Sequence, residues 1–269
     1  MPYCKQCGAK LPEDARFCPS CGTRVIIETK PVQTRRVLKV TGKPKVVITN
    51  TAPGSIEVKK GSKGEVTVDL DLRAPEDLDC NTSQEGNVVT VTCRMKAGLW
   101  KWTSYIFGAG PRANILVSVP AEADLDLENR AGRLKVAGVK GTLTAESSAG
   151  AVNMLDCEGT VEARTKAGSI DLENVSGTIT ARSSAGSIRF AGILSKSESG
   201  FKTSLGSIDL KLLSEPDLTV QASTNLGSIK CIPELTDAHY EGNRYVGRIG
   251  TGKGKLVAET STGSITIRQ

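Results

Sequence analysis

Apolar and polar residues alternate along most of this chain, and no stretch repeats with the period of a helix. The run Val66-Thr67-Val68-Asp69-Leu70 is typical of the alternation. Successive side chains of a strand point to opposite faces, so the pattern predicts strands with one buried face. Turn residues interrupt the apolar runs at short intervals. We therefore expect an all-β protein.

Glycine adds a longer period in the middle of the chain. It recurs at every ninth position, at 132, 141, 150, 159, 168, 177 and 186. Each unit reads Gly-x-apolar-x-apolar and then a polar turn, as in Gly168-Ser169-Ile170-Asp171-Leu172. Every second unit has an apolar eighth residue, at Val139, Cys157, Val175 and Ile193. Because alternate units differ in this way, the true repeat consists of two consecutive units.

A fixed internal period of this kind predicts a β-solenoid. Each 18-residue coil would carry two short strands, with the third and fifth residues of each unit pointing inward. The regular repeats cover residues 132–194, and looser copies begin at Gly54 upstream and at Gly263 downstream. We predict one β-solenoid over residues 37–269. Its final strand, Gly263 to Arg268, would leave an unpaired edge on which a second copy could stack.

The recurring Ser-Ser-Ala-Gly-Ser-Ile and the closing Thr262-Gly263-Ser264-Ile265 carry a family resemblance. They resemble the putative-adhesin family, a bacterial and archaeal repeat family of largely undefined function. The resemblance covers about residues 37–269. It implies a β-repeat fold, and the family label implies a role at the cell surface.

Four cysteines near the N-terminus form two Cys-x-x-Cys-Gly knuckles. The two-residue gap lets both sulfurs of a knuckle reach one ion, and the glycine tolerates a positive φ. Two knuckles complete a tetrahedral sulfur site without an open position, which is typical of structural zinc. We predict one structural Zn²⁺ held by Cys4, Cys7, Cys18 and Cys21 and covered by Phe17 and Val25. Metal binding would supply most of the folding free energy of so short a segment, on the order of 10 kcal/mol.

Residues 3–25 resemble the short zinc-ribbon domains at the N-termini of many bacterial and archaeal proteins. That resemblance implies a module for contact with a protein or a nucleic acid. We divide the chain into a zinc ribbon over residues 1–25, a linker over residues 26–36 and the solenoid over residues 37–269. The linker is mixed, charged and contains Pro31.

The positive charge belongs to the N-terminal part. Residues 1–45 hold ten Lys and Arg against three Asp and Glu, a difference of +7, whereas residues 46–269 hold 25 against 26, a difference of −1. Nucleic acid bound through residues 1–45 is one hypothesis. A solvated basic segment that serves solubility is the other.

The sequence also bears on the compartment. No apolar run approaches the roughly 20 residues that span a bilayer, and the N-terminus lacks the apolar core of a signal peptide. We expect no membrane span and a cytoplasmic location, where thiols stay reduced.

Cys80 and Cys93 flank a hairpin turn near Gly86-Asn87. A disulfide is possible there, but the cytoplasm favours two reduced thiols.

Three features that suggest catalysis have simpler explanations. Gly247 to Lys253 matches the first part of a phosphate-binding loop, but Gly254 replaces the Ser or Thr and a β-type segment follows. We predict a glycine-rich turn. His239, the only histidine, is predicted to be exposed in a polar loop over residues 233–250. Cys157 is predicted to be a small core residue.

The outer faces lack the pattern of paired carboxylates that a glycosidase needs. One face carries residues of both signs on successive coils, at Lys135, Asn153, Asp171 and Arg189. The other face carries Glu146, Arg164 and Arg182. The mixed signs indicate charge pairing between coils. We predict no catalytic residue and no enzymatic activity.

Four of the ten aromatic residues lie close together in the chain, at Trp100, Trp102, Tyr105 and Phe107. They could form an apolar plug that covers an open flank of the solenoid, as terminal repeats require. The alternative is a loop that contacts a partner or a sugar.

The sequence therefore predicts a zinc-binding scaffold or interaction protein. Its partner would be another protein, or a second copy stacked on the solenoid edge. Two alternatives stay open. One is nucleic-acid binding through the basic ribbon, and the other is an adhesin-like or carbohydrate-binding solenoid.

Overall fold

The computed structural model describes residues 3–4, 6–12, 17–23, 32–96, 110–232 and 235–269. The chain divides into two compact units, Met1–Pro31 and Val32–Gln269. Within the described part of the second unit, the only helical element is one short 3-10 turn, η1 (Pro75–Asp77). The all-β prediction is thus confirmed. No helix in the described ranges is long and apolar enough to cross a bilayer.

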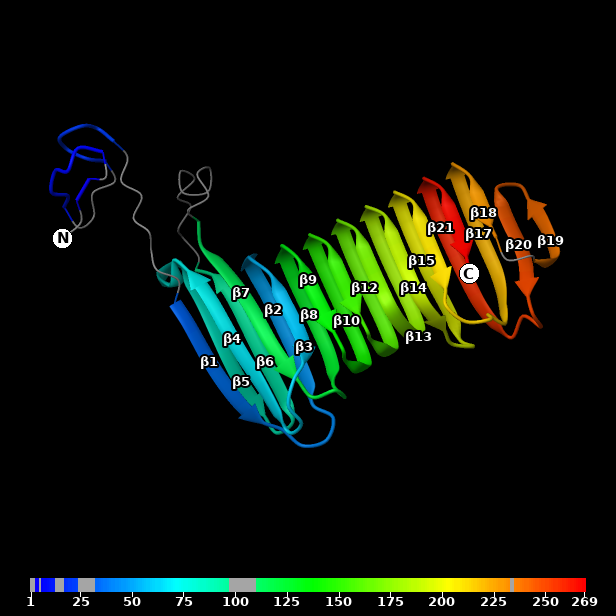
Figure 1. Cartoon of the computed structure of the whole chain (residues 1–269), viewed down its shortest axis with the longest axis horizontal. Helices are drawn as coiled ribbons and strands as arrows, with labels where there is room; N and C mark the ends of the chain where they lie inside the picture. Colours follow the sequence, from blue (N-terminus) through cyan, green and yellow to red (C-terminus); the bar gives the residue numbers. More distant parts are fainter. Residues whose placement is uncertain (1–2, 5, 13–16, 24–31, 97–109, 233–234) are drawn as a thin grey trace. The chain divides into compact units, whose positions relative to one another are not determined.

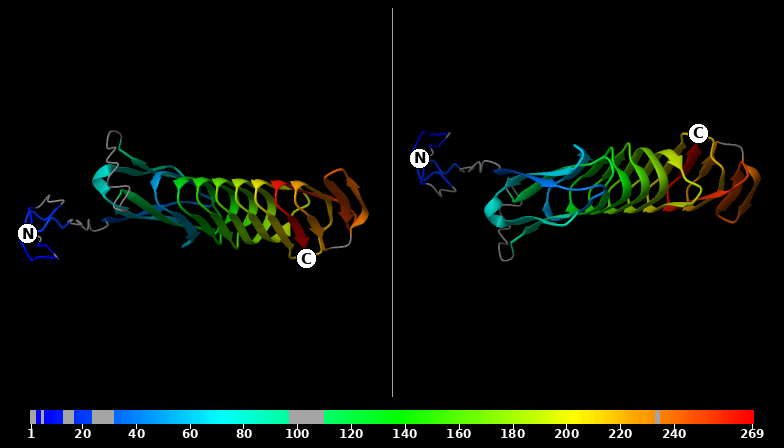
Figure 2. Two further views of the ribbon diagram at one scale, coloured as in Figure 1. Left: turned by 90° about the horizontal axis from the view of Figure 1, so that it is seen from above. Right: turned by 90° about the horizontal axis from the view of Figure 1, so that it is seen from below.

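The described residues of the second unit form 22 strands joined in one hydrogen-bonded sheet (Figure 1). Their pairing places them in two rows, and the long strand β13 (Ile170–Ala185) belongs to both. The first row runs, in spatial order, through β5 (Leu78–Glu85), β6 (Val88–Met95), β2 (Lys45–Pro53), β8 (Asp124–Ala131), β10 (Lys140–Ala149), β12 (Glu158–Ala167), the second half of β13, β15 (Glu198–Leu205), β21 (Gly254–Thr262), β17 (Leu218–Leu226), β20 (Arg244–Ile249) and β19 (Thr236–Glu241). The second row runs through β1 (Val32–Lys39), β4 (Glu65–Arg73), β7 (Arg112–Val119), β3 (Ile56–Lys60), β9 (Leu134–Ala137), β11 (Val152–Leu155), the first half of β13, β14 (Ile188–Leu194), β16 (Ile208–Leu212), β22 (Ile265–Arg268) and β18 (Ile229–Cys231). Figure 2 shows from above and below how the strands stack side by side.

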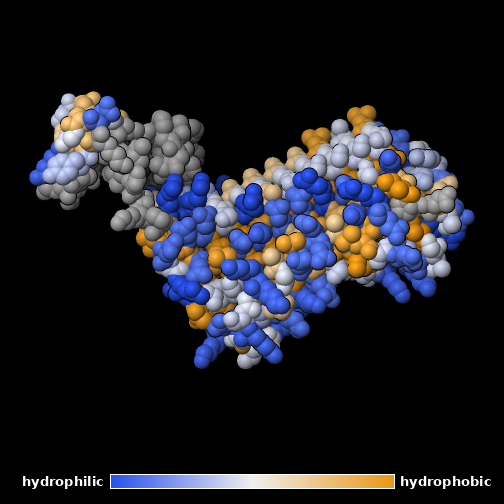
Figure 3. All heavy atoms as spheres, in the orientation of Figure 1, coloured by the Kyte–Doolittle hydropathy of each residue, from blue (hydrophilic) through white to orange (hydrophobic). Residues whose placement is uncertain are grey.

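Parallel neighbours in the middle of both rows pair at an offset of one full sequence repeat. Leu143 of β10 lies opposite Val161 of β12, which lies opposite Ile179 of β13, so each step equals two glycine units. In the second row, Val152 lies opposite Ile170 at the same offset. The third and fifth residues of the repeat units are buried here, as predicted from the alternation. Figure 3 shows polar side chains over most of the visible face of this unit, with apolar patches between them.

Glycine marks the corners where the chain passes from one row to the other. Gly168 has φ +151°, and a Cβ there would collide with the backbone carbonyl of Gly150 on the neighbouring strand pair. Gly159 has φ +127° at the opposite corner, where a Cβ would collide with the carbonyl of Gly141. Only glycine adopts such a backbone without strain. Both corners of the repeat therefore need glycine, which explains its recurrence at every ninth position.

Buried hydroxyl groups satisfy the carbonyls of these glycine corners. The side chains of Thr165, Ser183 and Thr203 lie in register on neighbouring strands and point inward. Their hydroxyls donate to the carbonyls of Gly150, Gly168 and Gly186 at 3.0, 3.1 and 2.8 Å. A buried carbonyl without a partner would be costly. These three inward hydroxyls form a polar ladder inside the apolar core, and each of them satisfies the carbonyl of one corner glycine.

The last two strands insert inside the rows instead of ending them. β21 pairs with β15 on one edge and β17 on the other, as Figure 1 shows. β22 pairs likewise with β16 and β18. Both edges of the final strand are therefore occupied by backbone hydrogen bonds. The prediction that Gly263 to Arg268 presents an unpaired edge to a second copy is wrong.

The sheet begins earlier than predicted. β1 starts at Val32, so residues 32–36, which were assigned to the linker, form part of a strand. β1 pairs antiparallel with β4 along its whole length. Two charged side chains fix it there, because Arg35 pairs with Asp69 at 3.6 Å and Arg36 donates to the carbonyl of Thr82 at 2.8 Å.

Cys80 and Cys93 form a disulfide. They lie directly opposite each other on the antiparallel strands β5 and β6, with Cα atoms 4.1 Å apart. This facing position brings the two sulfurs within bonding reach. The expectation of two reduced thiols is therefore wrong for this structure.

Candidate functional site

The four predicted zinc ligands come together in the first unit. The Sγ atoms of Cys4, Cys7, Cys18 and Cys21 all lie within 4.8 Å of one another. Sγ of Cys4 is 3.6 Å from Sγ of Cys21, and Sγ of Cys7 is 3.5 Å from Sγ of Cys18. Four sulfurs about 2.3 Å from a central tetrahedral zinc would be about 3.8 Å apart. The cluster therefore has the size that a zinc ion requires.

Each knuckle is a tight turn with the same backbone hydrogen bonds. The amide of Gly8 donates to the carbonyl of Cys4 at 2.9 Å, and the amide of Gly22 donates to the carbonyl of Cys18 at the same distance. Gly8 and Gly22 have φ values of +70° and +68°. The glycine after each second sulfur thus takes the left-handed conformation that its place in the motif predicted.

The interior of the ribbon is small. Leu11 is buried and packs against Cys4 and Cys18. Phe17 is 61% exposed, so the prediction that it covers the site is wrong, because Leu11 takes that place. Val25, the other predicted cover, lies outside the described residues. Few side chains are buried among the described residues of the first unit, so a bound metal would supply much of its stability.

The thiols themselves favour a cation at the centre. Hydrogen bonding with the Thr23 side chain lowers the pKa of Cys21 to about 6. For Cys7, the Ala9 backbone amide acts to lower the pKa, but hydrogen bonds with the sulfurs of Cys21 and Cys18 raise it to about 12. Four adjacent sulfurs resist losing all their protons together. A dication between them would remove that resistance, so the donor set fits Zn²⁺.

Comparison with protein families agrees with this arrangement. Residues 3–25 match the zinc-ribbon domain, and residues 143–268 match the family described as Toastrack DUF4097. Each of the two matches covers less than half of the chain, so the chain carries one segment similar to zinc ribbons and another similar to Toastrack domains. The Toastrack match begins within β10, so the strands that precede β10 lie outside it.

Solved structures similar to the chain are distant. A putative cell adhesion protein from Clostridium sporogenes aligns over 89% of this chain and 100% of its own, with 11% identity and a TM-score of 0.36. A putative adhesin from Bacteroides fragilis aligns over 88% and 97%, with 12% identity and a TM-score of 0.38. A putative lipid binding protein from Parabacteroides distasonis aligns over 87% and 96%, with 11% identity and a TM-score of 0.25. Nothing among curated proteins matches the chain. TM-scores this low carry no argument about function. The argument about function therefore rests on the residues of this chain.

Gly247 to Lys253 was predicted to be a turn, but Gly247–Ile249 belong to β20 and only the residues after them leave the strand. The carboxylate of Asp217, which precedes β17, occupies this turn. Asp217 accepts hydrogen bonds from the Thr251 hydroxyl at 2.9 and 2.8 Å and from the Lys253 amide at 3.3 Å. The Thr251 hydroxyl is the largest cause that lowers the pKa of Asp217. The donors that a phosphate would need are therefore already engaged by Asp217.

His239 and Cys157 have structural positions. His239 is exposed, as predicted, but it lies on β19 within a hairpin, so the prediction of a polar loop over residues 233–250 is wrong. Cys157 is buried in the Toastrack core, as predicted, and burial raises the pKa of its thiol. Ile193, predicted to share that inward corner, is instead 47% exposed.

The predicted outward charges form different ion pairs on the two rows. On the second row, Asp171 lies opposite Arg189 and pairs with it, and Lys135 pairs with Glu57 at 3.2 Å, so charge pairing between neighbouring strands is confirmed there. On the first row, Arg164 pairs with Glu162 of its own strand. The prediction of pairing between coils is therefore wrong for Arg164, which lies opposite Glu146 and Arg182 and pairs with neither. Elsewhere on the first row such pairing does occur, since Lys140 pairs with Glu158 and Lys202 pairs with Glu259 on neighbouring strands.

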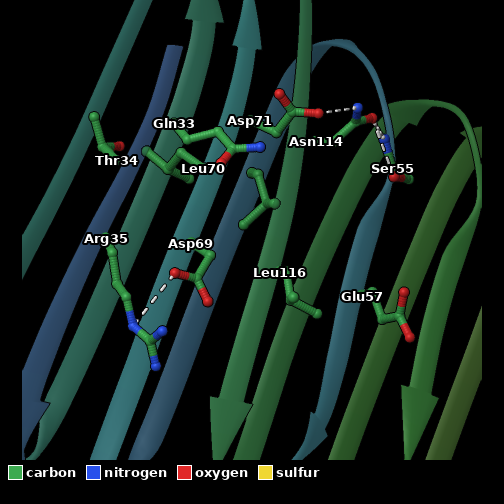
Figure 4. A pocket seen from close by; sticks show the side chains of 11 residues that line it. Gln33, Thr34, Arg35, Ser55, Glu57, Asp69, Leu70, Asp71, Asn114 and Leu116 are labelled. Atoms are coloured by element: carbon green, nitrogen blue, oxygen red, sulfur yellow. Dashed lines mark hydrogen bonds and ion pairs between the residues drawn. The ribbon is translucent and has the colours of Figure 1, made fainter. Parts of the chain in front are cut away.

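A polar pocket of about 480 Å³ opens on the second row, near the start of the sheet (Figure 4). Asn114 lies on one side of it, between Asp71 and Ser55. The side-chain oxygen of Asn114 accepts from the amide and hydroxyl of Ser55, both at 3.1 Å, and its NH₂ donates to Asp71 at 3.4 Å. Arg35 pairs with Asp69 on the opposite side, and Leu116 presents an apolar surface between them. Sequence reasoning missed this pocket because its residues come from four strands.

One acceptor in this pocket stands out. Oδ1 of Asp71 is buried and has no hydrogen-bond partner among the described residues. A buried acceptor of this kind is suited to a donor from outside the chain. The carboxylates of Glu57 and Asp69, by contrast, are held by Lys135 and Arg35.

The aromatic residues Trp100, Trp102, Tyr105 and Phe107 lie outside the described residues. Their two interpretations stay predictions, as does nucleic-acid binding through residues 1–45.

Proposed function

We propose that this protein is a non-catalytic interaction protein. In this proposal the ribbon holds one structural zinc ion, and the Toastrack region is a β-solenoid whose 18-residue coils each carry two short strands. The observation that carries the proposal is the closed set of four sulfurs, which leaves no coordination position for a substrate. The solenoid would serve as a rigid scaffold that displays its outer faces to a partner.

Metal analysis tests the zinc centre. Purified full-length protein should contain about one zinc per chain, with X-ray absorption from four sulfur ligands at about 2.3 Å. Cys7→Ser should lower the zinc content, whereas Cys231→Ser, in the second unit, should leave it unchanged. A site that purifies with iron, or with fewer than four sulfur ligands, would contradict the assignment.

The absence of catalysis is supported by the state of the polar groups. The carboxylates Asp171, Glu57 and Asp69 are engaged in ion pairs. His239 is exposed and contacts Glu241 at 3.1 Å, a neighbour on the same strand. These arrangements leave the described residues without the poised acid, base or nucleophile that catalysis needs.

A cytoplasmic location forms part of the proposal. The exposed, unbonded sulfurs of Cys7 and Cys21 favour a reducing compartment. The Cys80–Cys93 disulfide favours an oxidising one, but Cys93 is fully buried and thus shielded from soluble reductants. Alkylation of the thiols in freshly lysed cells, followed by mass spectrometry, tests this balance. Labelled Cys7 together with unlabelled Cys93 is the expected result.

The proposed partner is another protein rather than a second copy. In the described part of the sheet, the rows end at β18 and β19 on the side of the last strands. β18 has only three residues, and β19 contains a register irregularity and Asp237 with φ +52°. Short and irregular edges discourage pairing between copies. Light scattering should therefore report a monomer.

The pocket around Asn114 supports a second candidate function, the binding of a neutral saccharide. Its amides, its carboxylates and the unpartnered Oδ1 of Asp71 suit sugar hydroxyls, while Leu116 offers an apolar contact. Asp71→Asn and Asn114→Ala should each abolish NMR shifts caused by a bound neutral oligosaccharide. Asp126→Asn, on the first row, should not. Unchanged shifts in both pocket variants would rule out the site.

A further inference from the structure

A second groove, of about 620 Å³, lies on the outer face of the first row. It crosses three neighbouring strands, β12, β13 and β15, and reaches β21. Basic side chains and hydroxyl groups dominate its centre. The basic ones are Arg164, Lys166, Arg182 and Lys202.

The strand register brings three cations side by side. Arg164 lies opposite Arg182, and Arg182 lies opposite Lys202. Neighbouring strands are about 4.8 Å apart, and like charges directly opposite each other are destabilising. The second row shows the usual arrangement, in which opposite charges lie opposite each other. Asp171 there lies opposite Arg189.

Two of the cations in the groove have no partner among the described residues. Arg164 pairs with Glu162, and Lys202 pairs with Glu259 at 3.0 Å. Arg182 and Lys166, in contrast, have neither an ion pair nor a hydrogen bond to any described residue. Three acids also line the groove, but Glu198 and Glu259 are engaged by lysines. The third, Glu146 on β10, lies opposite Arg164, so one strand separates it from Arg182. The centre of the groove therefore keeps uncompensated positive charge.

A missing side chain opens the groove. Gly200 lies between Thr180 and Val257 on the neighbouring strands. Its φ is not in the left-handed region, and a Cβ placed there would meet nothing within 4 Å. Neither backbone strain nor crowding requires glycine at this position. Its effect is to leave open space between Thr180 and Val257, one outward position along the strands from Arg182 and Lys202. Ser184 and Ser204 add hydroxyl groups to the lining of the groove.

From this geometry we propose that the groove binds the acidic groups, sulfate or carboxylate, of an anionic polysaccharide. Charged donors and hydroxyls suit such groups. Among the described lining residues, the one aromatic side chain, Phe201, is buried, so no platform exists for stacking the bases of a single-stranded nucleic acid. Val257 is the remaining apolar lining residue, whereas a protein partner would need a larger apolar centre. The inference rests on the proposed interaction role and names a partner class for it.

Binding of defined oligosaccharides to the full-length protein tests the groove. The probes are a heparin-derived hexasaccharide for sulfate, hexagalacturonate for carboxylate, maltohexaose as a neutral sugar and oligouridylate as a nucleic acid. Lys166→Ser with Arg182→Thr removes the two unpartnered cations, and Ser184, which occupies the place of Lys166 in the next coil, shows that the repeat accepts serine. Lys211→Ser with Lys230→Thr removes two exposed lysines from the second row as the matched control. Gly200→Thr fills the groove without changing its charge.

An acidic hexasaccharide should bind, and its affinity should fall as salt rises. The Lys166/Arg182 variant should weaken binding about tenfold, which corresponds to the loss of one charge-assisted contact. Gly200→Thr should weaken it while keeping the protein folded, and the Lys211/Lys230 control should match the wild type. Preference between the sulfated and the carboxylated probe identifies the acidic group.

Several results would overturn the site. Equal affinity in the wild type and the Lys166/Arg182 variant would do so. A loss of affinity in the Lys211/Lys230 control as large as that in the Lys166/Arg182 variant would do so as well. Undiminished binding by Gly200→Thr would show that the groove has no part in it. Tighter binding of oligouridylate, sensitive to the same variants, would assign the surface to nucleic acid instead. Wild-type protein that binds neither acidic probe would refute this site but leave the zinc test of the proposed function intact.

Discussion

The hydroxyl of Thr165 donates a hydrogen bond to the carbonyl of Gly150, 3.0 Å away on the next strand pair. The contact joins two features that the repeat needs, a glycine at the corner and an inward hydroxyl beside it. Gly150 turns the chain at the corner with φ +152°, and the inward threonine satisfies the carbonyl that the turn leaves in the core. The same link recurs at Ser183 with Gly168. Neighbouring strand pairs are thus joined by side chains as well as by the backbone.

Thr165→Val should test the ladder. Valine keeps the shape of threonine but leaves the buried carbonyl of Gly150 without its donor, which should lower the free energy of unfolding by about 1–3 kcal/mol. Thr160→Val is the matched control on the exposed side of the same strand, where no such loss is expected. Urea unfolding of both variants measures the difference. Equal stabilities would mean that the ladder does not contribute.

Gly168→Ala should destabilise the corner. The added Cβ would meet the carbonyl of Gly150 and force alanine into a backbone region that essentially only glycine occupies. Such strain costs about 1–3 kcal/mol. Gly200→Ala is the contrast, because its Cβ meets nothing, and alanine there should stabilise the fold by about 0.4–1 kcal/mol. Opposite shifts in the urea midpoint are expected, and equal shifts would contradict the corner account.

Removal of the Cys80–Cys93 disulfide should destabilise the second unit. The bond closes a short loop, with a sequence separation of 13, for which chain entropy predicts a loss of about 3 kcal/mol. A Cys80→Ala, Cys93→Ala variant should unfold at lower urea concentration than the wild type. Reductant present during the urea titration reaches the bond once the chain unfolds, so it should lower the wild-type midpoint toward that of the variant and leave the variant itself unchanged. A wild type that ignores reductant would show that the bond is absent in solution.

Asp217 should make stability depend on pH. Its pKa is lowered in the folded chain, chiefly by the Thr251 hydroxyl. Its stabilising effect is therefore present above the unfolded pKa of about 3.9 and is lost as pH falls through the lower folded value. Asp217→Asn should be less stable than the wild type at pH 7, with the gap closing at acid pH. Denaturation at both pH values, followed by the β-strand circular dichroism signal, measures this. A constant gap would contradict the assignment.

Local and periodic features could be predicted from the sequence. The glycine spacing, the inward alternation and the sulfur knuckles each depend on residues close together in the chain, where steric rules act directly. The position of β22 could not be predicted in this way. Gly263-Ser264-Ile265 has the same form as Gly206-Ser207-Ile208 and Gly227-Ser228-Ile229, so nothing local tells it to insert between those two copies. Pairing between distant residues decides that order.

The basic groove illustrates a second limit. The sequence places Arg164 and Arg182 at the regular offset of one coil, but Lys202 lies beyond the position that the same offset from Arg182 would give. This lengthening of the coil hides Lys202 and Gly200 from a search at fixed period. The corresponding shift of the corner glycines, from 186 to 206, is the signal that could have revealed them. The pocket around Asn114 offers no such signal, because its strands β1, β4 and β7 pair outside the repeat.

The central claim is that zinc stabilises the ribbon, while the second unit, Val32–Gln269, folds without it. Adding a strong chelator to isotope-labelled full-length protein, with amide spectra recorded before and after, tests this claim most directly. Amides of residues 3–23 should lose their dispersion, because their few buried side chains cannot replace a metal worth about 10 kcal/mol or more. Amides of residues 32–269 should keep theirs. Loss of both sets together, or of neither, would contradict the account.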